Sequence, residues 1–278
     1  MKLTHIFLQI EKEIAAGTFN LPALPAIALN VRKAVKDPMM DLSKLATVVS
    51  FDPSFTAYLI ALANSPIYRG VGKIDSVTTA LGRMGMTSTR TSALIFAIRS
   101  LFKTSNKTCK TLLNEIWRQS CQVSALCYVI ADNLKTVEAE RASIAGLLHN
   151  VGLIPVIIKL VEQGETEQTI RDHWLKIQLF SRQIGVRVMS GWGLEDDLKA
   201  VSANILEWEL CHHQTLVNMV NLAIWHSYLG TPSFKEVPRL DKLGYFKGNP
   251  MLKLVDGKSL LFVKESQQEI KQMMQALN

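Results

Sequence analysis

The sequence predicts an all-α protein, a multi-helix bundle with short additions at its N- and C-terminal ends. Apolar residues recur at helical spacing along most of the chain, and no stretch alternates apolar and polar residues over enough length to require a sheet. With 278 residues, 48% of them hydrophobic, the chain can bury a large core without disulfide or metal staples. Disordered, collagen-like and disulfide-stabilised classes are therefore excluded.

The first two helices are predicted from an apolar stripe and from stop signals. Residues 4–16 follow a stripe that begins at Leu3 and ends at Ile14, and Gly17 stops this helix. Pro25 is suited to the start of a second helix, because its missing N–H would find no intrahelical acceptor there in any case. Asp37-Pro38 ends that helix, since proline disfavours helical geometry at the residue before it.

Four later helices are predicted from their N-caps. Asp41, Asp52, Ser76 and Thr87 each precede a helical apolar pattern, and a side-chain oxygen at that position accepts a hydrogen bond from a free backbone N–H of the first turn. Pro53 strengthens the prediction at Asp52. Ser76 and Thr87 thus predict two separate helices.

The pattern continues to the C-terminal end of the chain. Helices are expected over residues 112–134, 138–149 and 168–189, and the many Pro and Gly residues of 230–258 predict an extended surface segment. Ser266 and Glu269 form a capping-box sequence before a terminal amphipathic helix.

Export and membrane insertion are not predicted. Glu11 and Glu13 lie where a signal peptide would need an apolar run. The most apolar stretch, residues 144–161, contains His149, Asn150, Pro155 and Lys159, so it is better explained as a buried helix pair than as a transmembrane helix. The four cysteines form no CxxC pair, which favours reduced thiols. We therefore expect a cytoplasmic protein.

The net charge of +7 is concentrated in one region. Residues 51–110 hold eight Lys and Arg against two Asp. Such a region can attract an anionic ligand or an acidic protein surface, and a solvated basic face without a ligand explains it equally well. Few aromatic residues lie among these charges, which disfavours nucleic acid. Cys211-His212-His213 does not predict a metal site, because consecutive helical side chains diverge by about 100°.

A resemblance to a known superfamily is carried by residues 145–153, Ala-Gly-Leu-Leu-His-Asn-Val-Gly-Leu. This run resembles the signature helix of the HD metal-dependent phosphohydrolases, L-L-H-D-[IV]-G-K, in which the His and Asp bind divalent metals that activate water against a phosphate ester. Here Asn150 replaces the Asp, and a neutral amide is a weaker ligand than a carboxylate. The resemblance implies that His149 and Asn150 are a vestigial pair.

By the same resemblance, the other ligand positions fall at Gln119, near Ser181, around Ile205 and at Ile224. Only His149 is retained, so we expect no catalytic residue, no bound metal and no cofactor. The simpler alternative for His149 itself is a core histidine whose polar atoms are satisfied.

Six ordered strings in the N-terminal half identify the branch of the superfamily. They resemble the HDOD domain, the HD-related output domain of bacterial signalling proteins, from about residue 21 to 216. The strings are Leu21-Pro-Ala-Leu-Pro25, Lys36-Asp-Pro38, Phe51-Asp-Pro53, Ala61-Leu-Ala-Asn-Ser65, Ile74-Asp75-Ser76 and Leu81-Gly-Arg-Met-Gly85. We expect an N-terminal helix at 1–17, an HD-like HDOD domain at 18–229, and a loop-rich segment with a terminal helix packed on the domain at 230–278.

The resemblance implies a largely non-catalytic module of bacterial signal transduction, with a kinase, cyclase or receiver-type protein as partner. One alternative is a divergent metal-dependent phosphohydrolase that acts on a nucleotide or phosphodiester. A second is binding of a cyclic dinucleotide or nucleic acid through residues 51–110. The candidate residues for a ligand or partner are Asn64, Tyr68, Arg69 and Lys73, although Asn64 is also well placed simply to end its helix.

Overall fold

The computed structural model describes residues 2–35, 37–65, 68, 70, 72–209, 215–231, 237–244, 252–255 and 259–277. The described part is almost entirely helical, as the sequence predicts. Its elements are α1 (Lys2–Ala15), α2 (Ala26–Val35), α3 (Leu42–Ser50), α4 (Pro53–Ala63), α5 (Val77–Leu101), α6 (Lys107–Leu134), α7 (Ala139–Leu148), α8 (Leu153–Glu162), α9 (Glu167–Asp172), α10 (Trp174–Gly191), α11 (Asp196–Ala203), α12 (Thr215–Ser227), the 3₁₀ helix η3 (Leu240–Lys242), β1 (Leu254–Val255), β2 (Ser259–Leu260), α13 (Leu261–Glu265) and α14 (Gln267–Leu277).

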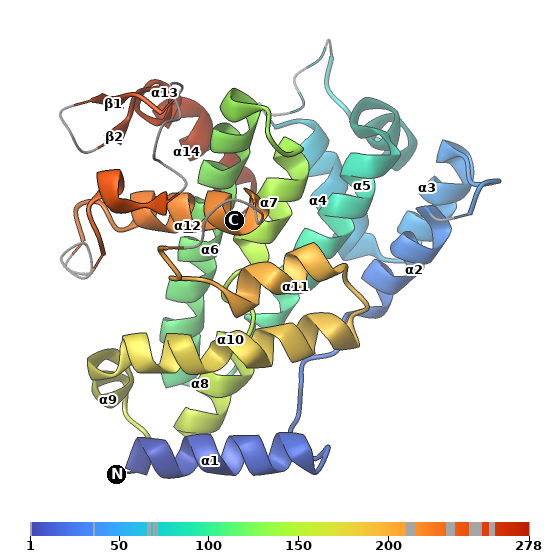
Figure 1. Cartoon of the computed structure of the whole chain (residues 1–278). Helices are drawn as coiled ribbons and strands as arrows, with labels where there is room; N and C mark the ends of the chain where they lie inside the picture. Colours follow the sequence, from blue (N-terminus) through green and yellow to red (C-terminus); the bar gives the residue numbers. More distant parts are fainter. Residues whose placement is uncertain are drawn as a thin grey trace.

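The helices α2, α3 and α4 and the first half of α5 form a smaller lobe, at the right of Figure 1. This lobe has its own hydrophobic cluster, in which Val31, Leu45, Phe55 and Leu81 are fully buried. Helix α5 then continues toward the larger lobe. The guanidinium of Arg32 on α2 also joins the lobes, because it donates hydrogen bonds to the backbone oxygens of Trp192 and Gly193 beyond α10.

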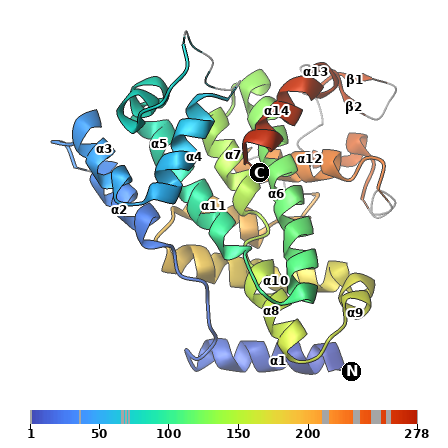
Figure 2. The same cartoon turned by 180° about the vertical axis from the view of Figure 1, so that it is seen from behind.

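The larger lobe is built around α6, which packs against α7, α8, α12 and α14. Figure 2 shows α14 beside α6 on the face opposite to that of Figure 1. Helices α6 and α7 approach closely because Gly146 has no side chain. A Cβ there would lie 2.9 Å from Cα of Ser124 and 2.8 Å from Sγ of Cys127. The hydroxyl of Ser124 donates to the backbone oxygen of Ser143 at 2.8 Å across this contact.

Helices α7 and α8 are the apolar pair that the sequence predicts to be buried. The segment Ala139–Glu162 is long and apolar enough to cross a membrane by composition, with a mean hydropathy of 1.9 in its most apolar window. However, 83% of that window is buried inside the protein. Its apolar side chains are therefore covered by neighbouring helices, as expected for the central helices of a globular core.

Helix α1 lies across one end of the larger lobe, below α8 and α10 in Figure 1. The ring of Phe7 stacks on Phe180 of α10, with 4.0 Å between centroids and 3° between planes. Nζ of Lys159 on α8 lies 2.7 Å from Oε1 of Glu13. These contacts attach α1 to two helices that are distant in sequence.

Three of the four predicted N-caps are confirmed. Side-chain oxygens of Asp41, Asp52 and Ser76 accept hydrogen bonds from the backbone N–H three residues later. The two helices predicted after Ser76 and Thr87 are both present within α5, but the break between them is a kink at Gly85 (φ 78°, ψ 173°), so the position predicted from Thr87 is wrong by two residues. This positive φ costs glycine little, since glycine has no Cβ.

Two further predictions need correction. The helix expected over residues 168–189 is interrupted at His173, whose φ of −115° lies outside the helical range, so that α9 and α10 are separate. The chain also contains an antiparallel pair, β1 with β2, in which Leu254 is opposite Leu260. Two residues per strand are too few to give a period-2 pattern in the sequence. The motif Cys211-His212-His213 lies outside the described residues.

Candidate functional site

The motif at residues 145–153 forms the end of α7 and the tight turn that leads into α8. His149 caps the C-terminal end of α7 and is 1% exposed. Its Nδ1 lies 2.6 Å from the backbone oxygen of Gly146. Because a carbonyl can only accept, Nδ1 carries the proton and Nε2 is left as an acceptor, which has no hydrogen-bond partner among the described residues. Burial lowers the pKa of His149 to about 4, so the ring is neutral at pH 7.

Asn150 is held between two glutamines on different helices. Its Oδ1 accepts from Nε2 of Gln178 on α10 at 3.2 Å, and its Nδ2 lies 3.5 Å from Oε1 of Gln119 on α6. Asn150 and Gln178 are each 1% exposed. We call these three residues the amide network. It connects α6, the turn after α7 and α10 through uncharged side chains.

The turn can approach α10 closely because Gly152 has no side chain. A Cβ at Gly152 would lie 2.1 Å from the backbone oxygen of Ser181 and 2.5 Å from the backbone nitrogen of Gly185. A Cβ at Gly185 would lie 2.1 Å from Oγ of Ser202 on α11. The two glycines thus allow the turn after α7, helix α10 and helix α11 to pack closely against one another.

The residues around His149 do not fit a catalytic divalent metal. The network supplies amide groups only, whereas Mg²⁺, Mn²⁺ and Zn²⁺ sites are built from several carboxylate, imidazole or thiolate ligands. Among the described residues, no three His, Cys, Asp or Glu side chains are grouped in a way that could hold a metal ion.

The positions that the HD resemblance assigned to metal ligands are only partly brought together. Gln119 lies beside Asn150, as the resemblance implies. The hydroxyl of Ser181 donates a hydrogen bond to the backbone oxygen of Gln178 at 2.8 Å. The residue that contacts Asn150 is instead Gln178, one helical turn before Ser181. Ile205 and Ile224 are buried apolar side chains. Sequence reasoning missed Gln178 because nothing local in α10 marks which of its residues faces the turn after α7.

Comparison with known proteins identifies the family. A model of the HDOD domain matches residues 21–205, two thirds of the chain. The chain belongs to the HDOD family. The resemblance of the six N-terminal strings is thereby confirmed. An "Uncharacterized protein" of Treponema pallidum (strain Nichols) is 22% identical over 198 residues that cover 68% of this chain and 38% of the relative. This chain therefore spans about two fifths of that relative's length.

Solved structures confirm the fold of this HDOD protein. A "Putative metal-dependent phosphohydrolase" of Shewanella amazonensis SB2B superposes with a TM-score of 0.80 at 21% identity and covers 100% of both chains. An HDOD domain protein of unknown function from Geobacter sulfurreducens gives 0.65 at 20% identity, over 99% of this chain and 98% of the other. A "Putative signal transduction protein" of Marinobacter aquaeolei VT8 gives 0.57 at 20% identity, over 94% of this chain and 59% of the other.

The described candidate ligand residues of the smaller HDOD lobe are Asn64, Tyr68 and Lys73, which lie between α4 and α5 in the sequence, and Asn64 holds this loop in place. Its Oδ1 accepts from the backbone N–H of Ile74 at 2.9 Å, and its Nδ2 donates to the backbone oxygens of Ile74 at 2.7 Å and Ile60 at 2.9 Å. Arg83 adds hydrogen bonds to the backbone oxygens of Ala63 and Gly72. The amide of Asn64 is therefore engaged in closing the loop.

The other candidates differ in accessibility. Tyr68 is half-buried, and its pKa is raised because burial disfavours the phenolate, although a hydrogen bond with Ser88 partly opposes this. Lys73 is exposed, and Arg69 lies outside the described residues. Of the described candidates, Lys73 is thus the most accessible to a ligand, whereas Asn64 is engaged in hydrogen bonds of the loop.

Proposed function

We propose that this HDOD protein is a non-catalytic output module of bacterial signal transduction that acts in the cytoplasm and binds a signalling protein of the kinase, cyclase or receiver type. The observation that carries this proposal is the amide network, in which uncharged side chains stand at two positions, Gln119 and Asn150, that the resemblance assigns to metal ligands. A divergent phosphohydrolase is the competing function.

The chemistry of the network argues against hydrolysis. Activation of water by a metal requires ligands that hold the ion and leave one coordination position open. Asn150 has both of its polar atoms directed at Gln119 and Gln178, and Nε2 of His149 is an isolated acceptor. Rotation of Asn150 toward an ion would break hydrogen bonds to buried partners, which costs about 1–3 kcal/mol for each group left unpaired. The site favours a structural role.

A partner-binding role is supported by large apolar side chains that the smaller lobe leaves in solvent. Phe51, between α3 and α4, is 83% exposed, and Met39, before α3, is 75% exposed. Aromatic and methionine side chains are enriched where proteins bind one another, because contact with a partner removes much of their apolar surface from water. Phe51 is therefore the position at which we would look for contact with a signalling protein.

Metal analysis and a phosphodiesterase assay test the non-catalytic part. The purified full chain is measured by elemental analysis and then assayed with bis-p-nitrophenyl phosphate in Mn²⁺, alongside His149→Ala. We expect less than one metal per chain and no turnover above the buffer. Stoichiometric metal together with turnover that is lost in His149→Ala would overturn the proposal in favour of a phosphohydrolase.

Photo-crosslinking in cells tests the partner. A photoreactive phenylalanine analogue replaces Phe51, and the same analogue at exposed Lys12 on α1 is the matched control. We expect a discrete adduct with a kinase, cyclase or receiver-type protein from position 51 only. Adducts that are the same from both positions would contradict a partner site at Phe51.

A further inference from the structure

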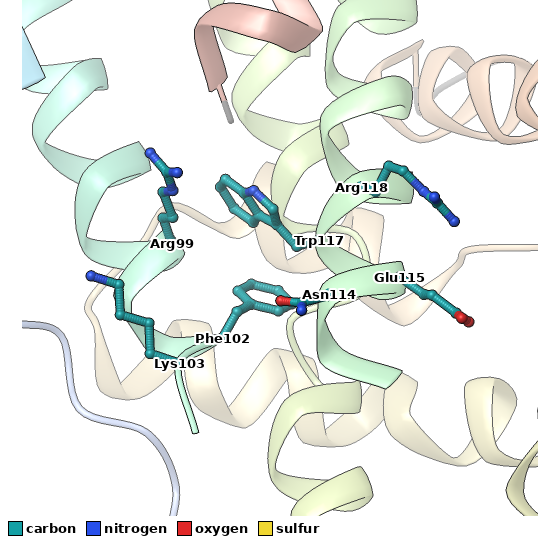
Figure 3. A pocket seen from close by; sticks show the side chains of 7 residues that line it. All are labelled: Arg99, Phe102, Lys103, Asn114, Glu115, Trp117 and Arg118. Atoms are coloured by element: carbon teal, nitrogen blue, oxygen red, sulfur yellow. The ribbon is translucent and has the colours of Figure 1, made fainter. Parts of the chain in front are cut away.

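A groove of about 450 Å³ lies on the larger lobe, outside the amide network, between the C-terminal end of α5 and the first half of α6. Figure 3 shows Arg99 and Lys103 along one side of it, with the side chains of Asn114 and Trp117 extending from α6 toward them. Its apolar floor comes from Phe102 and Trp117, whose rings are 5.2 Å apart. The groove therefore combines two cations, one amide and an apolar base.

The cations of this groove have no counter-charge in the described part of the chain. Arg99 is half-buried, and neither its side chain nor that of Lys103 forms an ion pair or hydrogen bond there. Other half-buried arginines of the larger lobe are paired: Arg141 with Asp197, and Arg182 with Glu207. Because a partly desolvated charge is unfavourable without a partner, Arg99 is a site where an anion would be stabilised.

The charge of Arg99 acts on buried groups of two neighbouring helices, Tyr58 on α4 and Cys121 on α6. Burial raises the pKa of Cys121 to about 12 and also raises that of Tyr58, and the positive charge of Arg99 opposes both shifts. Arg99 is half-buried, so its guanidinium is in an environment where electrostatic attraction is stronger than in bulk water.

The carboxylate beside the groove does not neutralise it. Glu115 also lines the cavity, but its two oxygens accept from the guanidinium of Arg171 at 2.7 and 2.9 Å. Figure 3 shows Glu115 and Arg118 projecting from α6 away from Arg99. The side chain of Arg118 forms no ion pair or hydrogen bond among the described residues, so its charge, which lines the groove but points away from Arg99, is not neutralised either.

We propose that this groove binds a phosphate ester of nucleotide size. The phosphate lies between Arg99 and Lys103, where charge-assisted hydrogen bonds are strongest, and the amide of Asn114 pairs with a polar edge of the organic part. The organic part covers the apolar floor. A cavity of about 450 Å³ suits a small molecule, since such sites span about 300–1,000 Å³.

A long nucleic acid fits this groove less well. Single strands bind through several exposed aromatic rings on which successive bases stack. Here Phe102 is 5% and Trp117 is 7% exposed, so little of either ring is open for a base to stack on. The proposed ligand is therefore a single small anion, and this site is independent of the partner surface at Phe51.

Calorimetric titration of the full chain at fixed ionic strength tests the proposal. The probes are adenosine 5′-monophosphate, guanosine 5′-monophosphate, inorganic phosphate and adenosine. Indole N–H resonances give a second readout, with the Trp117 signal assigned from Trp117→Phe. We expect at least one monophosphate to bind more tightly than phosphate or adenosine and to shift the Trp117 signal.

Two variants and a control locate the site. Arg99→Gln is expected to weaken binding about tenfold or more, because it removes a charge-assisted contact to phosphate. Lys103→Gln, an exposed change without a folding cost, is expected to act in the same direction. Arg187→Gln on α10 removes the same charge from an exposed position and is expected to leave affinity unchanged.

Three results would overturn the proposal. The first is an absence of binding by every probe at millimolar concentration, and the second is equal affinity for inorganic phosphate and both nucleotides. The third is equal weakening by Arg187→Gln and the groove variants, which would indicate non-specific attraction to net charge. None of these results bears on metal content or on crosslinking at Phe51.

Discussion

Nε2 of Gln178 lies 3.2 Å from Oδ1 of Asn150, and this hydrogen bond joins α10 to the turn between α7 and α8 at a position where both side chains are buried. In an HD phosphohydrolase, the residue at position 150 is expected to be a carboxylate that holds a metal. In this chain the same position serves the packing of helices. The substitution thus replaces a charge with a neutral group whose hydrogen bonds are made within the protein.

Restoring the carboxylate is expected to destabilise the fold. Asn150→Asp would place a charge among Gln119, Gln178 and His149 with no cation beside it, and we expect a loss of about 2–4 kcal/mol at pH 7. Burial would raise the pKa of the new carboxyl, so the loss is smallest below about pH 4 and grows as pH rises. Urea unfolding at several pH values measures this, with exposed Asn114→Asp as control. A variant as stable as the wild type at pH 7 would contradict the buried network.

Two buried histidines of the described chain predict loss of stability in acid. The pKa values of His149 and His226 are both lowered to about 4 by burial, from an ordinary value near 6.5. The unfolded chain therefore binds more protons between these values, and stability present above about pH 6.5 is lost as pH falls through 4. Each histidine contributes about 3 kcal/mol to this loss.

His149→Gln tests that assignment. Its unfolding free energy, measured by chemical denaturation between about pH 7 and pH 4, should depend on pH less steeply than that of the wild type. His5→Gln, at an exposed position on α1, should retain the wild-type slope. Equal slopes in all three proteins would show that His149 is not buried in its neutral form.

Gly152 is expected to be intolerant of any side chain. Gly152→Ala would force a methyl group against the backbone of α10, where the nearest atom is 2.1 Å from the ideal Cβ position. We expect a loss above about 3 kcal/mol or failure to fold, because backbone atoms in a packed core cannot move aside. Gly82→Ala is the control, since no atom lies within 4 Å of its Cβ position on α5. That change should stabilise the protein by about 0.5–1 kcal/mol, as measured by thermal unfolding.

Asn64 is expected to stabilise the loop between α4 and α5. Asn64→Ala removes three hydrogen bonds to Ile60 and Ile74, and we expect a loss of about 2 kcal/mol with faster amide exchange at Ile74. Asn64→Asp keeps the acceptor for the N–H of Ile74 and should retain part of its protection. If protection of the backbone N–H of Ile74 is unchanged in Asn64→Ala, the side-chain amide of Asn64 does not hold the loop and is free for a ligand.

Local signals in the sequence were sufficient for much of the fold. Asp41, Asp52 and Ser76 predict helix starts because a capping oxygen acts within three residues, and all three caps are present. The break in α5 falls at Gly85 instead of at the predicted Thr87. The backbone there has a positive φ that the glycine permits, whereas a threonine is compatible with both a cap and a helix interior.

The site depends on contacts that sequence spacing does not encode. Gln178 reaches Asn150 only because α10 crosses the turn at Gly152, and nothing within the sequence of α10 marks that crossing. The groove likewise draws Arg99 from α5 and Arg118 from α6, so the basic segment at residues 51–110 contained only part of it. Tertiary packing, not local propensity, decides which side chains meet.

The position of α1 has a practical consequence for work with fragments of this chain. The family match begins at residue 21, after α1, yet Phe7 covers Phe180 and Glu13 pairs with Lys159. A fragment trimmed to the family boundary would expose an aromatic ring on α10 and leave a half-buried ammonium group without its carboxylate. Such a fragment would be expected to self-associate, so expression should start upstream of the residues by which the family is recognised.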